Sequence, residues 1–238
     1  MCHSSIRTPI RFPEPFYAVG SFSKNIKIGK ISPVFKTGDQ QIFDNYRPSS
    51  IIPIFGKIFE KLIYSRLYRF FMSNKIIYTK QFGFRKHHST GNAINYSVNS
   101  IINEIQNNNH VIGIFIDLSK AFDTIDHEKL LVKLENNGIR GTTLKLLKDY
   151  LNDRDQYVYF KGVDSENVKM EFGVPQGSVL GPLLFLIYIN DLVNSSNDGK
   201  FVLFADDTNI FVSGKNEEDV YIKAQNVLND VQNYMIVN

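Results

Sequence analysis

Cysteine is nearly absent from this sequence: Cys2 is the only one among 238 residues. A single thiol excludes an internal disulfide framework and any zinc site built on paired cysteines, and its simplest interpretation is an intracellular protein. Long apolar runs are also missing. The longest, Val179 to Ile189, contains Gly181 and Pro182 and is too short to span a bilayer. The N-terminus has no continuous apolar segment of the kind that a secretory signal needs.

A strong excess of either charge is missing as well. The formal net charge is +3, a mildly basic balance that is compatible with nucleic acid without indicating it. The hydrophobic fraction of 43% and the charged fraction of 21% are typical of a globular protein with a buried core, in one large or two small domains. Residues 1–20 differ, because their three prolines and scattered Ser and Thr show no periodicity. They predict a disordered or extended leader before an organised region over 21–238.

Hydrophobic periodicity predicts helices over 57–71, 90–105, 127–136, 142–151, 179–192 and 217–235. Strands are expected over 28–35, 110–116, 156–160, 168–172 and on both sides of 204–207. The strand over 110–116 has the pattern of a buried strand. The helix that starts near Ser89 or Thr90 should bury an apolar stripe made of Ile94, Val98, Ile101, Ile102 and Ile105. Helices and antiparallel strands mix without a regular βαβ alternation, which favours an α+β fold.

An acidic pair, Asp206-Asp207, is the most informative feature of the chain. Apolar, strand-like segments flank it on both sides within 201–212. Adjacent carboxylates repel each other unless a cation lies between them, and their hard oxygens suit Mg²⁺, which usually takes one or two protein carboxylates plus substrate phosphates. A β-turn is the alternative interpretation, because Asp is common in turns. The flanking strands and a third carboxylate favour a metal site for phosphoryl chemistry.

Asp117 is that third carboxylate. It ends the apolar run 110–116, where it is well placed to join the acidic pair at one metal site. Two ions about 3.5–4 Å apart would stabilise both the attacking and the leaving oxygen of an in-line displacement. Asp126 precedes a predicted helix and suits an N-cap, whereas Asp123 is either structural or a support for the metal ligands.

Weaker signals come from a loop and two cations. The Gly- and Pro-containing loop 173–178 lets backbone N–H groups and the amide of Gln176 approach a ligand, although it also suits an ordinary helix entry. Arg47 and Lys36 lie beside predicted turns and are able to bind phosphate, although isolated surface cations are usually inert.

Together these segments resemble the reverse transcriptases of non-long-terminal-repeat retrotransposons, most closely the jockey-like group. The motifs that carry the resemblance occur in the family's order and at similar spacings. They are Pro33-Val34-Phe35-Lys36-Thr37-Gly38-Asp39, Asn45-Tyr46-Arg47-Pro48, Gln81-Phe82-Gly83-Phe84-Arg85, Phe115-Ile116-Asp117-Leu118-Ser119-Lys120-Ala121-Phe122-Asp123, Gly173-Val174-Pro175-Gln176-Gly177-Ser178-Val179-Leu180-Gly181-Pro182 and Phe204-Ala205-Asp206-Asp207.

The resemblance implies a right-hand polymerase fold of fingers and palm, with an antiparallel palm sheet packed on helices. It implies an RNA-directed DNA polymerase that uses an RNA template, a DNA primer and deoxynucleoside triphosphates. By the same resemblance, Asp117, Asp206 and Asp207 are catalytic and hold two Mg²⁺ ions, for which Mn²⁺ can substitute, and Leu118 adds its backbone carbonyl. No membrane partner is expected, and the family's chromosomal target favours the nucleus.

Further roles follow from the resemblance. Lys36 and Arg47 match positions that clamp the triphosphate, and Phe122 matches an aromatic gate that excludes a ribose 2′-hydroxyl. Gln176 and Gly177 would line the nucleotide pocket. The remaining matched side chain, Arg85, would touch the template.

Members of the family continue into a further palm segment, a thumb and a nuclease, and the resemblance leads us to expect a chain that is truncated before them. A missing thumb predicts low affinity for the primer–template duplex and low processivity, because the thumb contacts its phosphates. Two alternatives stay open: a catalytically silent, truncated relic that at most binds nucleic acid, and, more remotely, a two-metal nuclease. The residues alone do not separate a polymerase from another two-metal phosphoryl enzyme, so the RNA template rests on the resemblance.

Overall fold

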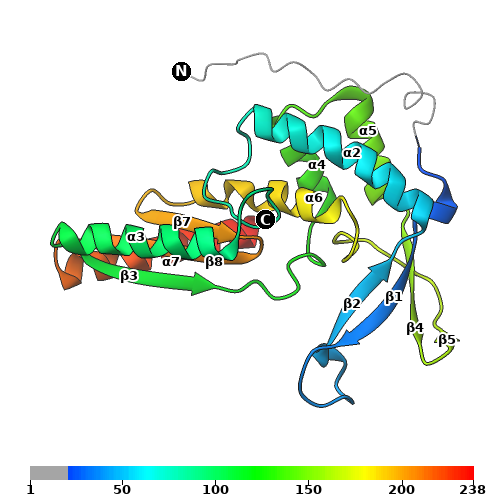
Figure 1. Ribbon diagram of the computed structural model, residues 1–238, viewed down its shortest axis with the longest axis horizontal. Coiled ribbons are helices and arrows are strands. Elements are labelled where there is room, and N and C mark those ends of the chain that lie inside the picture. Colours follow the sequence, from blue (N-terminus) through cyan, green and yellow to red (C-terminus); the bar gives the residue numbers. More distant parts are fainter. Residues whose placement is uncertain (1–20) are drawn as a thin grey trace. The chain divides into compact units, whose positions relative to one another are not determined.

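The structure is a computed structural model that describes residues 21–238 (Figure 1). The predicted leader, residues 1–20, lies outside the described residues. The chain divides into two compact units. The first unit contains the residues up to Ile76 together with Phe122–Phe185, and the second contains Ile77–Ala121 together with Leu186–Asn238.

The first unit combines a mixed sheet with helices (Figure 1). The strand order is β2-β1-β4-β5, and β6 also pairs with β4. β1 runs antiparallel to β2 and parallel to β4, so the sheet is not a simple meander. The strands are β1 (Ile28–Phe35), β2 (Tyr46–Ile51), β4 (Asp155–Phe160), β5 (Val163–Asp164) and β6 (Val168–Lys169); the helices are α2 (Ile54–Ser73), α4 (His127–Asn136), α5 (Gly141–Leu151) and the start of α6 (Gly181–Ile189), with short 3₁₀ turns at Lys24–Ile26 and Phe43–Asn45.

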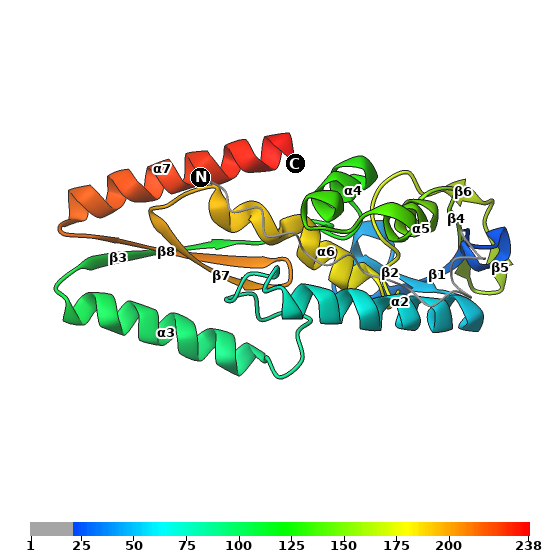
Figure 2. The same ribbon diagram turned by 90° about the horizontal axis from the view of Figure 1, so that it is seen from above.

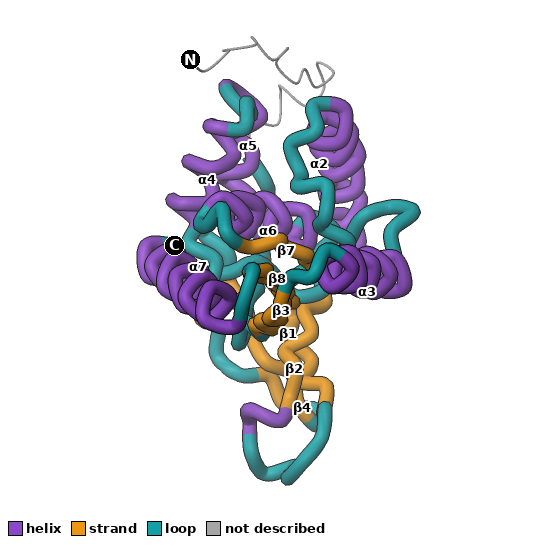
Figure 3. The backbone as a smooth tube through the Cα atoms, turned by 90° about the vertical axis from the view of Figure 1, so that its left-hand side faces the viewer, coloured by secondary structure: helices purple, strands orange, loops and turns teal. Residues whose placement is uncertain are grey.

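The second unit is a three-stranded sheet between two long helices (Figures 2 and 3). All its pairs are antiparallel, in the order β3-β8-β7. One face packs on α3 through a cluster that includes Ala93, Val202 and Phe211, and α7 lies on the opposite face. The elements are α3 (Thr90–Gln106), β3 (His110–Ile116), the 3₁₀ turn η3 (Asn190–Asn194), β7 (Gly199–Phe204), β8 (Asp207–Gly214) and α7 (Glu217–Val237). The mixture of helices and antiparallel strands confirms the predicted α+β class.

Short polar residues set the helix starts. The Ser89 side chain accepts a hydrogen bond from the Asn92 backbone N–H, and the Asn92 side chain accepts one from the Ser89 backbone, which makes a capping box at the start of α3. The Asp126 side chain accepts from two backbone N–H groups in the first turn of α4. The predicted start near Ser89 and the predicted N-cap at Asp126 are therefore confirmed.

Two burial predictions are wrong. β3 was expected to be buried, but it lies at the edge of the sheet and Phe115 is 73% exposed. The apolar stripe of α3 was also expected to be buried, yet four of its five residues are exposed: Ile94 is 62% and Ile105 58% exposed, and Val98 and Ile102 are exposed as well. The fifth, Ile101, is partly buried and packs against the core cluster. The small side chain of Ala93 contacts the sheet instead, and Phe82 fills the space beside it. Periodicity marks an apolar face, but the partner decides which part of that face is covered.

A buried carboxylate ties together three segments of the first unit. Glu60 on α2 is 1% exposed and accepts hydrogen bonds from the hydroxyl of Tyr150 on α5, at 2.9 Å, and from the backbone N–H of Val179 just before α6. Burial, and then the negative charge of Glu60, raise the pKa of Tyr150, so the phenol stays protonated and donates. None of the described helices, α6 included, is long and apolar enough to cross a membrane.

Replacing Glu60 by alanine should destabilise the first unit by roughly 2–4 kcal/mol, because two buried donors lose their acceptor. Denaturant unfolding measures this change in the free energy of unfolding. Glu135→Ala, at an exposed position of α4, is the matched control and should change it by less than about 0.5 kcal/mol. Equal unfolding midpoints for the two variants would contradict the role of Glu60.

Candidate active site

The acidic pair lies at the tip of the β7–β8 hairpin. Phe204 pairs with Asp207, so Ala205 and Asp206 form a two-residue turn between the strands. Ala205 has φ +57°, a left-handed conformation that tight hairpin turns require at such a position. The core positions of both strands are fully buried, as at Val202 and Val212. The two acidic side chains therefore extend from a rigid base, as the sequence predicted.

Strand register brings Asp117 to the same end of the sheet. β3 pairs with β8 from His110 opposite Gly214 to Ile116 opposite Thr208. Asp117 follows the last paired residue directly, so it leaves β3 at the end of the sheet where β8 begins with Asp207. All three predicted carboxylates thus belong to the second unit and lie at the same end of its strands.

The charges of Asp117 and Asp206 affect the ionisation of Asp207. The pKa of Asp207 is raised, first by partial loss of hydration and then by the negative charges of Asp206 and Asp117. Neighbouring negative charges disfavour the ionised form of a carboxyl group, so a cation bound among these three residues would be favourable. Even so, among the described residues no three His, Cys, Asp or Glu side chains are gathered closely enough to hold one metal ion.

Gln81 holds the hairpin tip in place. Its Oε1 accepts hydrogen bonds from the backbone N–H groups of Gly83, at 2.8 Å, and Ala205, at 3.0 Å, and its Nε2 donates to the carbonyl of Ala205 at 3.4 Å. The side chain is 1% exposed. A Cβ on Gly83 would lie 2.1 Å from the Ala205 nitrogen, so only glycine fits there. No role was predicted for the side chain of Gln81, because a polar residue outside any periodic segment carries no signal of burial.

Arg85, predicted to touch the template, has partners within its own loop. One guanidinium nitrogen donates to the carbonyls of Tyr78, Thr79 and Gln81, at 2.8–3.3 Å. These bonds shape the segment that presents Gln81 to the hairpin. The template contact of Arg85 stays a prediction.

All five residues predicted to bind the nucleotide belong to the first unit. Gln176 donates from its amide to both carboxylate oxygens of Asp123, at 2.9 and 2.8 Å, so Asp123 fixes the orientation of the amide. The backbone carbonyl of Gln176 accepts a hydrogen bond from the backbone N–H of Ser50 on β2. Gly177 has φ +102°, and a Cβ there would lie 2.9 Å from the Ser50 carbonyl oxygen. Asp123, Ser50 and Gln176 help to line a hollow of about 260 Å³.

The other predicted nucleotide contacts also lie in the first unit. The Phe122 ring stacks on Phe185 with centroids 4.6 Å apart, which restricts its position. Arg47 is an exposed residue of β2 opposite Val34, and Lys36 follows β1 and donates its backbone N–H to Asn45. Their roles, and that of the Leu118 carbonyl beside Asp117, remain predictions.

Comparison with known proteins matches residues 34–238 to the family "Reverse transcriptase (RNA-dependent DNA polymerase)". The chain belongs to this family. It is 34% identical over 205 residues to the RNA-directed DNA polymerase from mobile element jockey of Drosophila melanogaster, which covers 83% of this chain and 22% of that protein. It is also 34% identical over 198 residues to the probable RNA-directed DNA polymerase from transposon X-element of the same fly, covering 81% and 22%. The predicted jockey-like resemblance is confirmed.

A solved structure supports the fold of this reverse transcriptase domain. Telomerase from Candida tropicalis, in complex with a fragment of telomeric RNA, superposes with a TM-score of 0.61 at 14% identity, covering 93% of this chain and 41% of that one. At this identity the likeness concerns the fold alone, and it agrees with the predicted fingers and palm. The chain spans about a fifth of the length of the two fly relatives.

Replacing Gln81 by leucine should destabilise the reverse transcriptase domain, because the buried N–H groups of Gly83 and Ala205 lose their shared acceptor at about 1–3 kcal/mol each. Denaturant unfolding provides the measurement. Gln232→Leu, at an exposed position of α7, is the control. If the two variants unfold at the same denaturant concentration, Gln81 does not hold the hairpin.

Asp207 should also impose a pH dependence on folding. Its folded-state pKa lies above the unfolded value, so between these values the native state binds more protons, and its stabilising contribution is lost as pH rises through the folded pKa. Carboxyl ¹³C NMR titration reports this pKa directly. In Asp117→Asn the pKa of Asp207 should fall toward the ordinary value, because one of the neighbouring charges is gone. The control Asp198→Asn, just before β7, should leave the pKa of Asp207 unchanged. If both variants give the same pKa for Asp207, the charge of Asp117 does not act on this carboxyl group.

Proposed function

We propose that this chain carries the nucleotidyl-transfer centre of an RNA-directed DNA polymerase. The observation that carries the proposal is the β7–β8 hairpin, which places Asp206 and Asp207 side by side at its turn. The pKa of Asp207 is raised, first by burial and then by the charges of Asp206 and Asp117. Such coupled, perturbed carboxylates are typical of functional sites. Membership of the reverse transcriptase family and the names of the fly relatives support this reaction, with RNA as the template.

The types of donor atom suit divalent cations, because carboxylate oxygens are preferred ligands of Mg²⁺ and Mn²⁺. As placed in the described residues, the three side chains are not gathered closely enough to hold one ion, so binding would require them to draw together. Asp117, Asp206 and Asp207, with the carbonyl of Leu118, would then hold two Mg²⁺ ions, for which Mn²⁺ would substitute. The ions would supply positive charge against the oxygens of the reacting phosphate.

The remaining roles fall to side chains that bind and orient the nucleotide. Lys36 and Arg47 bind the triphosphate as cations, and the guanidinium of Arg47 suits bidentate contact with phosphate oxygens. Gln176, oriented by Asp123, lines the nucleotide site together with Gly177. In the reaction, the primer 3′-oxygen bonds to the α-phosphorus, the bond to pyrophosphate breaks, and the hydroxyl proton leaves to solvent.

Phe122 is proposed to select the sugar. Its ring is stacked on Phe185, so it cannot move aside without losing that contact. A fixed ring beside the sugar would clash with a 2′-hydroxyl and so favour deoxynucleotides over ribonucleotides.

Single-nucleotide incorporation tests the proposal, because it does not depend on processivity. The chain is mixed with a poly(A) template, an oligo(dT) primer, dTTP and Mg²⁺. Asp206→Asn should lower the incorporation rate at least about 100-fold, because it removes a carboxylate that binds the ions and leaves the hairpin of similar shape.

Asp153→Asn is the matched control. Asp153 is 72% exposed and makes only a surface ion pair with Lys169, at 3.3 Å, so this variant should incorporate dTTP at the wild-type rate. Equal rates for wild type and Asp206→Asn would contradict the proposal and leave the relic that at most binds nucleic acid.

A further inference from the structure

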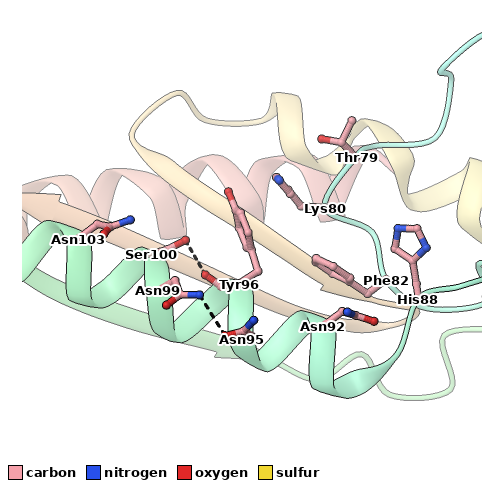
Figure 4. A pocket seen from close by; sticks show the side chains of 10 residues that line it. All are labelled: Thr79, Lys80, Phe82, His88, Asn92, Asn95, Tyr96, Asn99, Ser100 and Asn103. Carbon is pink, nitrogen blue, oxygen red and sulfur yellow. Dashed lines mark hydrogen bonds between the residues drawn. The ribbon is translucent and has the colours of Figure 1, made fainter.

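A second hollow lies in the second unit, apart from the three carboxylates. It has a volume of about 420 Å³ and lies between α3 and the segment from Thr79 to His88 (Figure 4). The proposed polymerase reaction assigns no role to it. Its lining differs from the usual apolar pocket, because polar amides dominate it.

Four asparagines form a ladder along one side of α3. Asn92, Asn95, Asn99 and Asn103 are spaced three or four residues apart, so they succeed one another along the hollow (Figure 4). With a rise of 1.5 Å per residue, the ladder is about 16 Å long. A side-chain amide has both donors and an acceptor, although the oxygen of Asn92 already accepts from Ser89 in the capping box. Asn99 donates to Asn95 at 3.0 Å, and both side chains are exposed.

Lys80, Phe82 and His88 face the ladder from the segment 79–88, whereas Tyr96 belongs to α3 itself. The Lys80 ammonium lies 4.1 Å from the centroid of the Tyr96 ring, a cation–π contact. Phe82 lies between the Tyr96 and His88 rings, with centroid distances of 6.2 and 5.7 Å. Figure 4 shows Tyr96 projecting from α3 and Lys80 projecting toward it from the facing segment. Among the described residues that line it, none is acidic.

We propose that this hollow, the asparagine groove, binds a single-stranded polynucleotide. The inference rests on the proposed polymerase function, because that function brings single-stranded template or primer to the chain. Amides pair with the donor and acceptor edges of bases, as Asn does with adenine. The partly buried Tyr96 offers ring surface on which an unpaired base can stack, while Phe82, 8% exposed, supports that ring from the core. Lys80 and a lining free of carboxylates suit a phosphate backbone. An acidic peptide lacks the planar bases that the aromatic rings and amides would recognise.

A pair of isosteric substitutions tests the groove. Asn95→Asp with Asn99→Asp places two negative charges in it without changing side-chain size. α7 offers a matched control, because Gln225 and Asn229 are also exposed and hydrogen-bonded at i and i+4, at 3.2 Å. Gln225→Glu with Asn229→Asp adds the same charge and the same repulsion between neighbouring turns.

Affinity is measured by fluorescence anisotropy, with short labelled RNA and DNA strands of one mixed sequence, at low salt and in EDTA without nucleotide. The groove variant should bind at least one strand about tenfold or more weakly than wild type, whereas the α7 control should change by less than about twofold. The strand that is affected identifies the source as RNA, DNA or both. Wild-type affinity of the groove variant for both strands, or an equal loss in the control, would overturn the proposal.

Further variants keep the test decisive. If thermal unfolding shows that the groove variant is not folded, Lys80→Gln, which removes the cation of the groove, takes its place and should weaken binding at least about threefold. Asp206→Asn should bind both strands like wild type. A chain that shows groove-dependent binding but no incorporation refutes only the polymerase proposal, and normal incorporation with groove-independent binding refutes only the groove.

Discussion

The antiparallel pairing of β3 with β8 is the interaction on which the proposed chemistry depends. It ends at Ile116 opposite Thr208, so Asp117 follows at the end of the sheet where Asp206 and Asp207 lie. Burial, and then the negative charges of Asp206 and Asp117, raise the pKa of Asp207, so repulsion among these charges opposes the arrangement. A fully buried sheet core, with Val202 and Val212 packed on opposite sides of the hairpin strands, offsets that repulsion. Repulsion among the carboxylates therefore lowers the stability of the fold at the place where a bound cation would restore it.

Polar contacts buried outside the sheet make the arrangement specific. Gln81 satisfies two backbone N–H groups and one carbonyl at the hairpin tip, so the turn has one preferred position. In the first unit, Asp123 orients Gln176, and the close approach of Gly177 to Ser50 fixes the loop that follows. The bonds of Gln81 to Ala205 and of Gln176 to Asp123 join residues far apart in sequence, and loss of Gln81 would leave buried N–H groups unpaired. The groups proposed to contact substrate are therefore supported by a second layer of side chains.

Local features were predictable from the sequence, and long-range ones were not. The strand over 28–35, the helix over 127–136 and the caps at Ser89 and Asp126 follow from periodicity and short-range hydrogen bonds. The exposure of Phe115 and Ile94 depends on which neighbours the sheet and helix acquire, and periodicity does not report neighbours. Gln81 belongs to a motif that carries the family resemblance, but its buried contacts with Ala205 were not predictable for the same reason. The three aspartates could be predicted as a group because each lies at the end of an apolar, strand-like run, a pattern that is visible in the sequence.

The most direct measurement of the central claim is paramagnetic broadening of backbone amide NMR signals by Mn²⁺. If Asp117, Asp206 and Asp207 share bound cations, substoichiometric Mn²⁺ should broaden the signals of Leu118 and Asp206 together, at the same concentration, and excess Mg²⁺ should restore both. Broadening confined to one of these two segments, or to neither, would contradict the account.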